Sequence, residues 1–81
     1  MLHKLKTQSK IVGMKQTVKA IEENRVNIVF VAKDAQKDVI DKIVNIATFN
    51  NVNIQYVDNM IQLGKACEVD VKTATAALVK E

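Results

Sequence analysis

The sequence has one cysteine, one histidine, two glycines and no proline among its 81 residues. Cys67 alone cannot form an intrachain disulfide, and one cysteine with one histidine cannot assemble a structural zinc site. This composition fits a reducing compartment such as the cytoplasm. Gly13 and Gly64 lie too far apart to build a phosphate loop or a dinucleotide fingerprint, which both need closely spaced glycines. We therefore expect neither a metal nor a nucleotide cofactor.

Long hydrophobic runs are also missing. The longest apolar run, Ile28 to Ala32, has five residues, whereas a membrane span needs about 20 and the core of a signal peptide about seven. We therefore expect a soluble protein without a targeting segment. A chain of 81 residues that is 48% apolar and 26% charged is typical of one small globular domain, here residues 1–81.

The sequence offers little for catalysis. A nucleophilic site of the Ser/His/Asp or Cys/His kind would have to use His3, near the terminus, and no pair of carboxylates stands out as an acid and base couple. Cys67 follows Ala66 in an apolar stretch, where a free cysteine usually serves as a small core residue. We therefore expect that the protein is not an enzyme. An enzyme that uses Cys67 as its nucleophile is the most distant alternative function.

The positive charge is concentrated at the start of the chain. The net charge is +3, but residues 1–21 contain five lysines and no acid, so the remainder is −2. Such asymmetry indicates an anionic partner, and nucleic acid is the commonest kind for a soluble domain. A solvated N-terminal arm would give the same charge count.

The spacing of apolar residues predicts helices that alternate with strands. We expect helices over residues 1–9 and 14–23, from Asp34 to about Phe49, and from Asp58 onwards, with strands over 11–12, 26–32, 53–57 and 73–79. Residues 26–32 are nearly continuously apolar, which indicates a strand covered on both faces, and 53–57 is expected to be a second internal strand. This order predicts an α/β architecture with a sheet between helix layers.

Side chains suited to helix ends occur at the expected boundaries. Asp34 and Asp58 are expected to cap the starts of the helices that follow them. Asn24 is expected to stop the helix over 14–23, and Asn50 with Asn51 to stop the next.

The stretch from Ile11 to Ala20 is the first candidate binding site. Gly13 permits a sharp turn from strand to helix, and Lys15 and Lys19 then share one helix face with Gln16 beside them. The unpaired N–H groups at the helix start add further donors. Donors without an acid nearby suit phosphates and base edges. A solvated helix face would show the same residues.

Three segments together resemble one known family. They are Gly-Met-Lys-Gln-Thr-Val-Lys at 13–19, Val-Ala-Lys-Asp at 31–34, and the segment 63–77, which contains Leu-Gly-x-x-x-x-Val-x-Val. In these segments the chain resembles the kink-turn RNA-binding ribosomal proteins (the L-seven-Ae class), and most closely their short bacterial YbxF-type members. The resemblance covers nearly the whole chain.

The resemblance implies a three-layer α/β/α sandwich with a mixed four-stranded sheet. It also implies a monomer that binds kink-turns, in which a three-nucleotide bulge beside tandem sheared G·A pairs bends the duplex, in ribosomal RNA, riboswitches or on the ribosome. Ordinary A-form RNA hides its major groove, and a bent, bulged site opens it to a helix N-terminus. The implied contacts are Gly13, Met14, Lys15, Gln16, Lys19, Lys33, Asp34, Val69, Asp70 and Val71.

Specific roles follow from the same resemblance. Many family members have Asn-Glu where this chain has Lys15 and Gln16, which can still donate to purine edges. The segment 69–71 matches the loop that packs on the extruded bulge nucleotide. Two positions depart from the family: Glu68 replaces a usual glycine, and Lys72 a small residue. A glycine at 68 would end the helix in a left-handed turn, which glutamate adopts only at a cost.

A second class of function stays open. The chain could be a ribosome-associated or assembly subunit that contacts proteins and has no kink-turn specificity. In that case the basic N-terminal residues would be only a solvated arm.

Overall fold

The computed structural model describes residues 9–80, which form four strands and three helices. The helix expected over residues 1–9 therefore lies outside the described residues except for Ser9. His3 also lies outside them. The elements are β1 (Lys10–Val12), α2 (Met14–Glu22), β2 (Val26–Ala32), α3 (Lys37–Phe49), β3 (Asn53–Val57), α4 (Met60–Ala66) and β4 (Thr75–Val79). Each element expected between residues 11 and 79 is present.

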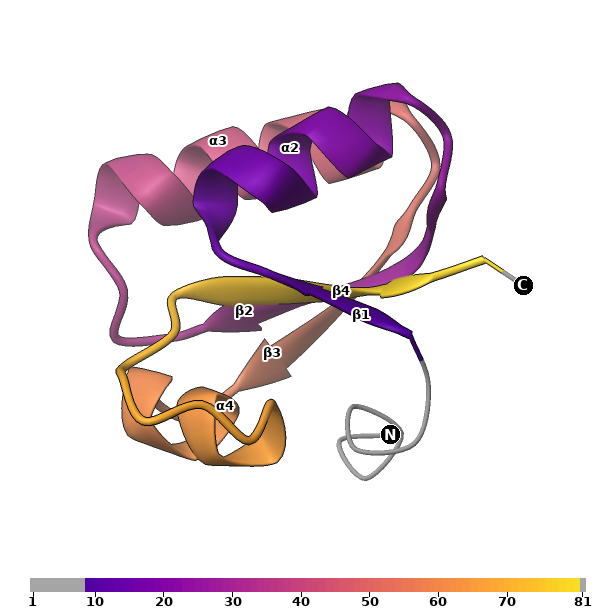
Figure 1. The fold of residues 1–81 in the computed structure, drawn as a ribbon. Helices are drawn as coiled ribbons and strands as arrows, with labels where there is room; N and C mark the ends of the chain where they lie inside the picture. Colours follow the sequence, from indigo (N-terminus) through magenta and orange to yellow (C-terminus); the bar gives the residue numbers. More distant parts are fainter. Residues whose placement is uncertain (1–8, 81) are drawn as a thin grey trace.

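The four strands form one mixed sheet in the order β1-β4-β2-β3. Strand β4 runs antiparallel to both β1 and β2, and β3 runs parallel to β2. Helices α2 and α3 cover one face of the sheet and α4 lies on the opposite face (Figure 1). The expected three-layer α/β/α sandwich with a mixed four-stranded sheet is confirmed.

Strand β2 divides the core into two halves because its side chains alternate between the two faces of the sheet. Val29 and Val31 pack with Ile21 of α2 and Ile43 of α3. Ile28, Phe30 and Ala32 pack on the other face with Leu63 and Cys67, from the α4 region. The expectation of a strand covered on both faces is confirmed, as is Cys67 as a buried core residue, 1% exposed.

Strand β3 is not internal, as its sequence had suggested, but lies at the edge of the sheet. Within residues 9–80 it pairs with β2 alone, and Asn53, Gln55 and Tyr56 are exposed. An edge strand has a neighbour on one side only, so polar side chains can face solvent there. The apolar residues of β3 indicated a strand correctly, but its place in the sheet depends on which strands pair with it.

The two N-caps predicted from the sequence were wrong, whereas the start of α2 at Met14 and the predicted helix ends were right. The N-cap of α3 is Gln36 instead of Asp34. The N-cap of α4 is Asn59 instead of Asp58, and the Gln62 backbone N–H donates to its Oδ1 atom at 2.7 Å. The chain leaves α2 through Asn24 and α3 through Asn51, each with a left-handed φ of 58°, which asparagine tolerates better than most residues.

Candidate functional site

The segments singled out in the sequence meet at one end of the sheet. Because β1, β2 and β3 all run opposite to β4, the residues that follow these three strands lie beside the residues that precede β4. Gly13 follows β1, Lys33 follows β2, and the segment 67–74 leads into β4. The start of α2, the end of β2 and the start of β4 all lie toward the left of the sheet in Figure 1. Folding therefore brings together segments that are up to 61 positions apart in the sequence, from Gly13 to residue 74.

Backbone hydrogen bonds hold this end of the sheet in a fixed arrangement. The Gly13 N–H donates to the Thr75 carbonyl at 3.0 Å, which joins the start of α2 to the start of β4. The Thr73 N–H donates to the Met60 carbonyl at 3.1 Å. The Met60 N–H in turn donates to Oδ1 of Asp34 at 2.8 Å. The start of α2, the end of β2, α4 and the segment before β4 are thus connected.

Helix α2 begins directly at the turn after β1. Gly13 is its N-cap with φ 101° and ψ 154°, a conformation that glycine adopts far more readily than other residues. The first turn of α2 contains no acid. Lys15, Gln16 and Lys19 are exposed on the helix surface, and Met14 instead packs against the core beneath the helix. The first two turns of α2 thus expose cationic and amide groups, and the exposed acid of this helix, Glu22, is its last residue.

Lys33 and Asp34 follow β2 and both have partners within the protein. The Lys33 Nζ atom lies 3.6 Å from the Asp58 Oδ1 atom, and both side chains are largely exposed, so this pair contributes little to stability. Asp34 accepts the hydrogen bond from Met60. Sequence reasoning missed this bond because it joins residues 26 positions apart. Elsewhere in residues 9–80, the only ion pair is between Arg25 and Glu23.

The segment between α4 and β4 has the left-handed turn that the sequence suggested. Glu68 has φ 60°. Val69 is half-buried and packs against the core, whereas Val71 is 68% exposed. Gly64 explains the position of this segment, because a Cβ atom there would overlap with the carbonyl oxygen of Val71. Glycine at 64 lets the backbone before β4 lie directly against α4.

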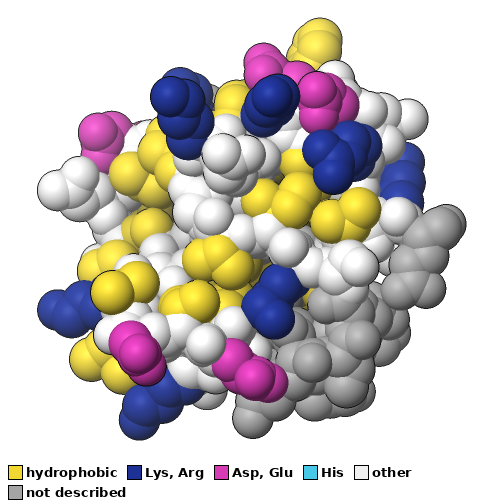
Figure 2. All heavy atoms as spheres, viewed as in Figure 1, with side chains coloured by type: hydrophobic (Ala, Val, Ile, Leu, Met, Phe, Trp, Pro, Cys, Tyr) yellow, Lys and Arg dark blue, Asp and Glu magenta, His cyan; other side chains and the backbone are white. Residues whose placement is uncertain are grey.

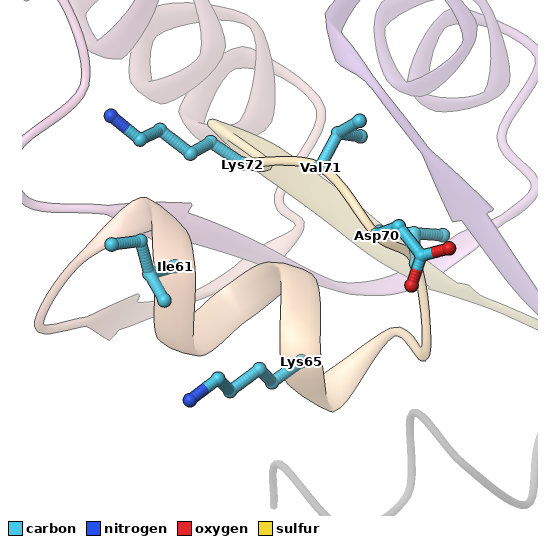
Figure 3. Close-up of a pocket in the computed structure, with 6 residues that line it drawn as sticks. Ile61, Lys65, Asp70, Val71 and Lys72 are labelled. Atoms are coloured by element: carbon cyan, nitrogen blue, oxygen red, sulfur yellow. The ribbon is translucent and has the colours of Figure 1, made fainter.

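This close approach leaves a pocket of about 300 Å³ between α4 and the segment before β4. It is lined by Ile61, Lys65, Val69, Asp70, Val71 and Lys72 (Figure 3). Sequence reasoning had assigned 69–71 to the site but missed Ile61, Lys65 and Lys72. The spacing of Ile61 and Lys65, one helical turn apart, is the signal that could have placed both on one face of α4.

The surface is not uniformly basic. Figure 2 shows lysine and arginine side chains separated by hydrophobic and uncharged atoms, with a few acidic groups between them. Electrostatic attraction alone would therefore give this face little preference for one anion over another. Any selectivity must come from the arrangement of individual donors and apolar groups.

Two further features are absent from residues 9–80. In that range no cluster of three or more His, Cys, Asp or Glu side chains is arranged to hold a metal ion. No helix in the same range has the length and apolar character needed to cross a membrane.

Several described proteins are similar to this chain in sequence. An RNA-binding protein of Halalkalibacterium halodurans is 47% identical over 70 residues, which cover 86% of this chain and 85% of the relative. The RNA-binding protein YbxF of Geobacillus stearothermophilus is 39% identical over 70 residues with the same coverage. The large ribosomal subunit protein eL8 of Halobacterium salinarum is 32% identical over 68 residues, 83% of this chain and 57% of that protein.

Solved structures share the fold. A protein from Bacillus halodurans, described as of unknown function, matches with a TM-score of 0.87 at 20% identity and covers 98% of this chain and 83% of its own. A 15.5 kD RNA-binding protein of Giardia lamblia matches with a TM-score of 0.80 at 24% identity, over 99% of this chain and 68% of its own. The model of the ribosomal protein L7Ae/L30e/S12e/Gadd45 family matches residues 2–81, and the chain belongs to this family.

Proposed function

We propose that this chain is a non-catalytic RNA-binding protein that recognises kink-turns. The observation that carries the proposal is the exposed face of Lys15, Gln16 and Lys19 at the start of α2, with no acid in the first turn. The hydrogen bond from Gly13 to Thr75 joins the start of α2 to the first residue of β4, which directly follows the segment 67–74. Relatives described as RNA-binding proteins support the same class of function.

The start of α2 is proposed to read the opened major groove of the kink-turn. Lys15 and Gln16 can donate hydrogen bonds to purine edges, and Lys19 can contact a phosphate one turn further along the helix. The unpaired N–H groups of the first turn favour a negatively charged ligand. Gly13 and Met14 serve this surface by setting the direction and depth of the helix rather than by donating hydrogen bonds.

The segment 69–71 is proposed to contact the extruded bulge nucleotide. Val71 is one of few large hydrophobic side chains with more than half of its surface exposed, and an unstacked base provides apolar surface that could cover it. Val69 packs inward and supports the segment from below. Asp70 lies between them and is exposed. Lys33 and Asp34 are proposed to lie at the border of the RNA contact.

The proposed partners are kink-turns in ribosomal RNA, riboswitches or other structured RNA. The chain is proposed to act as a monomer in the cytoplasm without a cofactor. A second function, that of a ribosome-associated or assembly subunit without kink-turn specificity, draws on the similarity to a large-subunit ribosomal protein.

A binding titration tests the proposal. A kink-turn RNA is compared with a duplex of the same length that lacks the bulge, by gel shift over a range of salt concentrations. The kink-turn should bind more tightly, with a log-log salt slope of about −3 to −6 if roughly that many phosphates are contacted. Equal binding to both RNAs would favour the second function, and no binding would contradict the proposed contact with RNA.

A further inference from the structure

The pocket between α4 and the segment before β4 combines exposed apolar surface with positive charge. Ile61 is 52% exposed and Val71 is 68% exposed. Lys65 and Lys72, which line the same pocket, are also exposed. In Figure 3 their ammonium groups extend to one side of the view, above and below Ile61, and the Asp70 carboxylate points to the other side. The two cations thus lie on either side of Ile61, and Val71 adds exposed apolar surface on the opposite wall of the pocket.

The backbone that carries these side chains is firmly held. The Val69 N–H donates to the Gly64 carbonyl at 3.1 Å, and the Thr73 N–H donates to the Met60 carbonyl at 3.1 Å. Between these two bonds the carbonyl of Val71 rests against Gly64. The relative position of the α4 wall and the opposite wall is therefore fixed before any ligand arrives, which reduces the entropy lost on binding.

Neither lysine is engaged within the described part of the protein. No carboxylate of residues 9–80 lies within 4 Å of the Nζ atom of Lys65 or Lys72, since the ion pairs in that range involve other residues. Both ammonium groups are therefore available to an anionic ligand beside the segment proposed to meet the RNA.

We propose that Lys65 and Lys72 bind the two backbone phosphates that flank an unstacked RNA nucleotide, whose sugar and base lie on Ile61 and Val71. This proposal rests on the proposed function and extends it from the segment 69–71 to the outer face of α4. Two cations beside exposed apolar side chains can bind a single nucleotide, because the cations attract its phosphates and the apolar side chains contact the faces of its base. Such contacts do not depend on which base is extruded.

An acidic peptide would offer similar chemistry, but RNA fits the position of the pocket better. Val69, Asp70 and Val71 line the pocket and belong to the segment that leads into β4, whose first residue, Thr75, accepts the hydrogen bond from Gly13 at the start of α2. An RNA strand that contacts the start of α2 in the proposed major-groove contact could therefore continue along this segment into the pocket. A separate protein partner would have to compete with that strand for the same residues.

The test uses the full chain, a kink-turn RNA and three substitutions of equal charge change. Lys65→Gln and Lys72→Gln each remove one proposed phosphate contact. Lys80→Gln is the matched control, because Lys80 follows β4 at the opposite end of the sheet, where its Nζ atom donates to Asn24 at 2.9 Å. Thermal unfolding of each variant checks that the fold is retained.

Each pocket substitution should reduce the steepness of the log-log salt slope by about 0.7 to 0.9. The loss of affinity relative to the parent should consequently grow about threefold as salt falls from roughly 200 to 50 mM. Lys80→Gln should change neither quantity beyond a small uniform effect. Replacing the extruded base should leave the losses caused by Lys65→Gln and Lys72→Gln unchanged.

A modified RNA makes the assignment specific. Uncharged methylphosphonates are placed at the two phosphates beside the extruded nucleotide, and the parent should lose affinity for this RNA. On it, Lys65→Gln and Lys72→Gln should have no further effect. If both substitutions behave like Lys80→Gln while Lys15→Ala weakens binding, the pocket proposal is wrong and the kink-turn function stands. If the parent does not prefer the kink-turn, both proposals fail.

Discussion

Asp34 and Met60 are joined by a hydrogen bond in which the Met60 backbone N–H donates to the Asp34 carboxylate at 2.8 Å. Asp34 follows β2 and Met60 is the first residue of α4, so a side chain from one element caps another that begins 26 residues later. Helix starts have N–H groups without helical partners, and here Asn59 and Asp34 satisfy two of them. This bond fixes α4, and with it one wall of the pocket, to the central strand.

Removing this cap should loosen that end of the molecule. Asp34→Ala is expected to lower the free energy of unfolding by about 1 kcal/mol, the usual contribution of a side-chain cap, and to weaken kink-turn binding through displacement of α4. Asp58→Ala is the control, because it breaks only an exposed ion pair, and should cost less than about 0.5 kcal/mol. Equal effects in chemical denaturation would show that the cap contributes nothing specific.

Gly64 provides a second test of how the site is held. Gly64→Ala should destabilise the protein by about 1 to 3 kcal/mol, because the new Cβ overlaps with the backbone of Val71 and the segment before β4 must move. Alanine stabilises a helix relative to glycine by about 1 kcal/mol. The net destabilisation given above already includes this gain. The change should also weaken kink-turn binding.

The control for Gly64 lies in the same helix. Gln62 is exposed, so Gln62→Ala should leave both the free energy of unfolding and RNA affinity close to those of the parent. A Gly64→Ala variant that is more stable than the parent would mean that the segment before β4 moves away from α4 freely.

The features that sequence predicted well are those set by neighbouring residues. The apolar run over 26–32 gives the central strand, and the spacing of Met14, Val18 and Ile21 gives the buried side of α2. The left-handed turn at Glu68 followed from comparison with the family pattern, and its φ of 60° confirms it.

The features that sequence did not predict depend on contacts between distant segments. The Asp34 side chain suits a cap, but nothing local shows that it caps α4 instead of α3. Residues 53–57 form a strand in either position, and strand order alone makes β3 an edge. Gly64 has no special backbone angle to reveal its purpose, which is the close approach of Val71. Each of these required the three-dimensional arrangement.

The exposed start of α2 yields the most direct test of base recognition. Lys15→Ala and Gln16→Ala should each reduce kink-turn affinity by about 1 to 3 kcal/mol if the side chains read base edges. Both are exposed, so the melting temperature should hardly change. Glu22→Ala, on the last residue of the same helix, serves as the control. If both variants bind the kink-turn as the parent does, α2 is not the recognition element.

Cys67 should make stability fall at alkaline pH. Burial raises the pKa of its thiol, and the charge of Lys10 lowers it by a smaller amount. Because the unfolded thiol loses its proton at lower pH than the folded one, ionisation favours the unfolded chain above about pH 8.5. The contribution is absent below that pH and grows by at most about 1.4 kcal/mol per pH unit until the folded thiol also ionises.

Cys67→Ala isolates this contribution from other groups that titrate at high pH. The free energy of unfolding of the variant should decline less steeply than that of the parent between about pH 8.5 and 10, whatever the cost of the substitution at pH 7. Labelling of the native parent with a thiol reagent at pH 7 should also be slow. Parallel pH profiles for the two proteins would contradict this account.

Glu68 carries the clearest conflict between residue type and backbone conformation. Its φ of 60° is left-handed, which costs a residue with a Cβ atom about 1 kcal/mol or more. Its carboxylate also lies just beyond the C-terminal end of α4, where negative charge is unfavourable, and next to the segment proposed to meet RNA. Both effects favour replacement, so Glu68→Gly should leave the free energy of unfolding unchanged or raise it and should tighten kink-turn binding.

Glu68→Gln separates the two causes, because it removes the charge and keeps the Cβ atom. Relief of strain alone predicts that Glu68→Gly gains stability and that Glu68→Gln matches the parent, since the freer unfolded chain offsets only part of the gain from glycine. Removal of repulsion predicts that both variants bind the kink-turn more tightly, with the largest gain at low salt, where phosphate and carboxylate are least screened. If neither variant binds more tightly at low salt, the Glu68 carboxylate is directed away from the RNA and only its backbone conformation affects this loop.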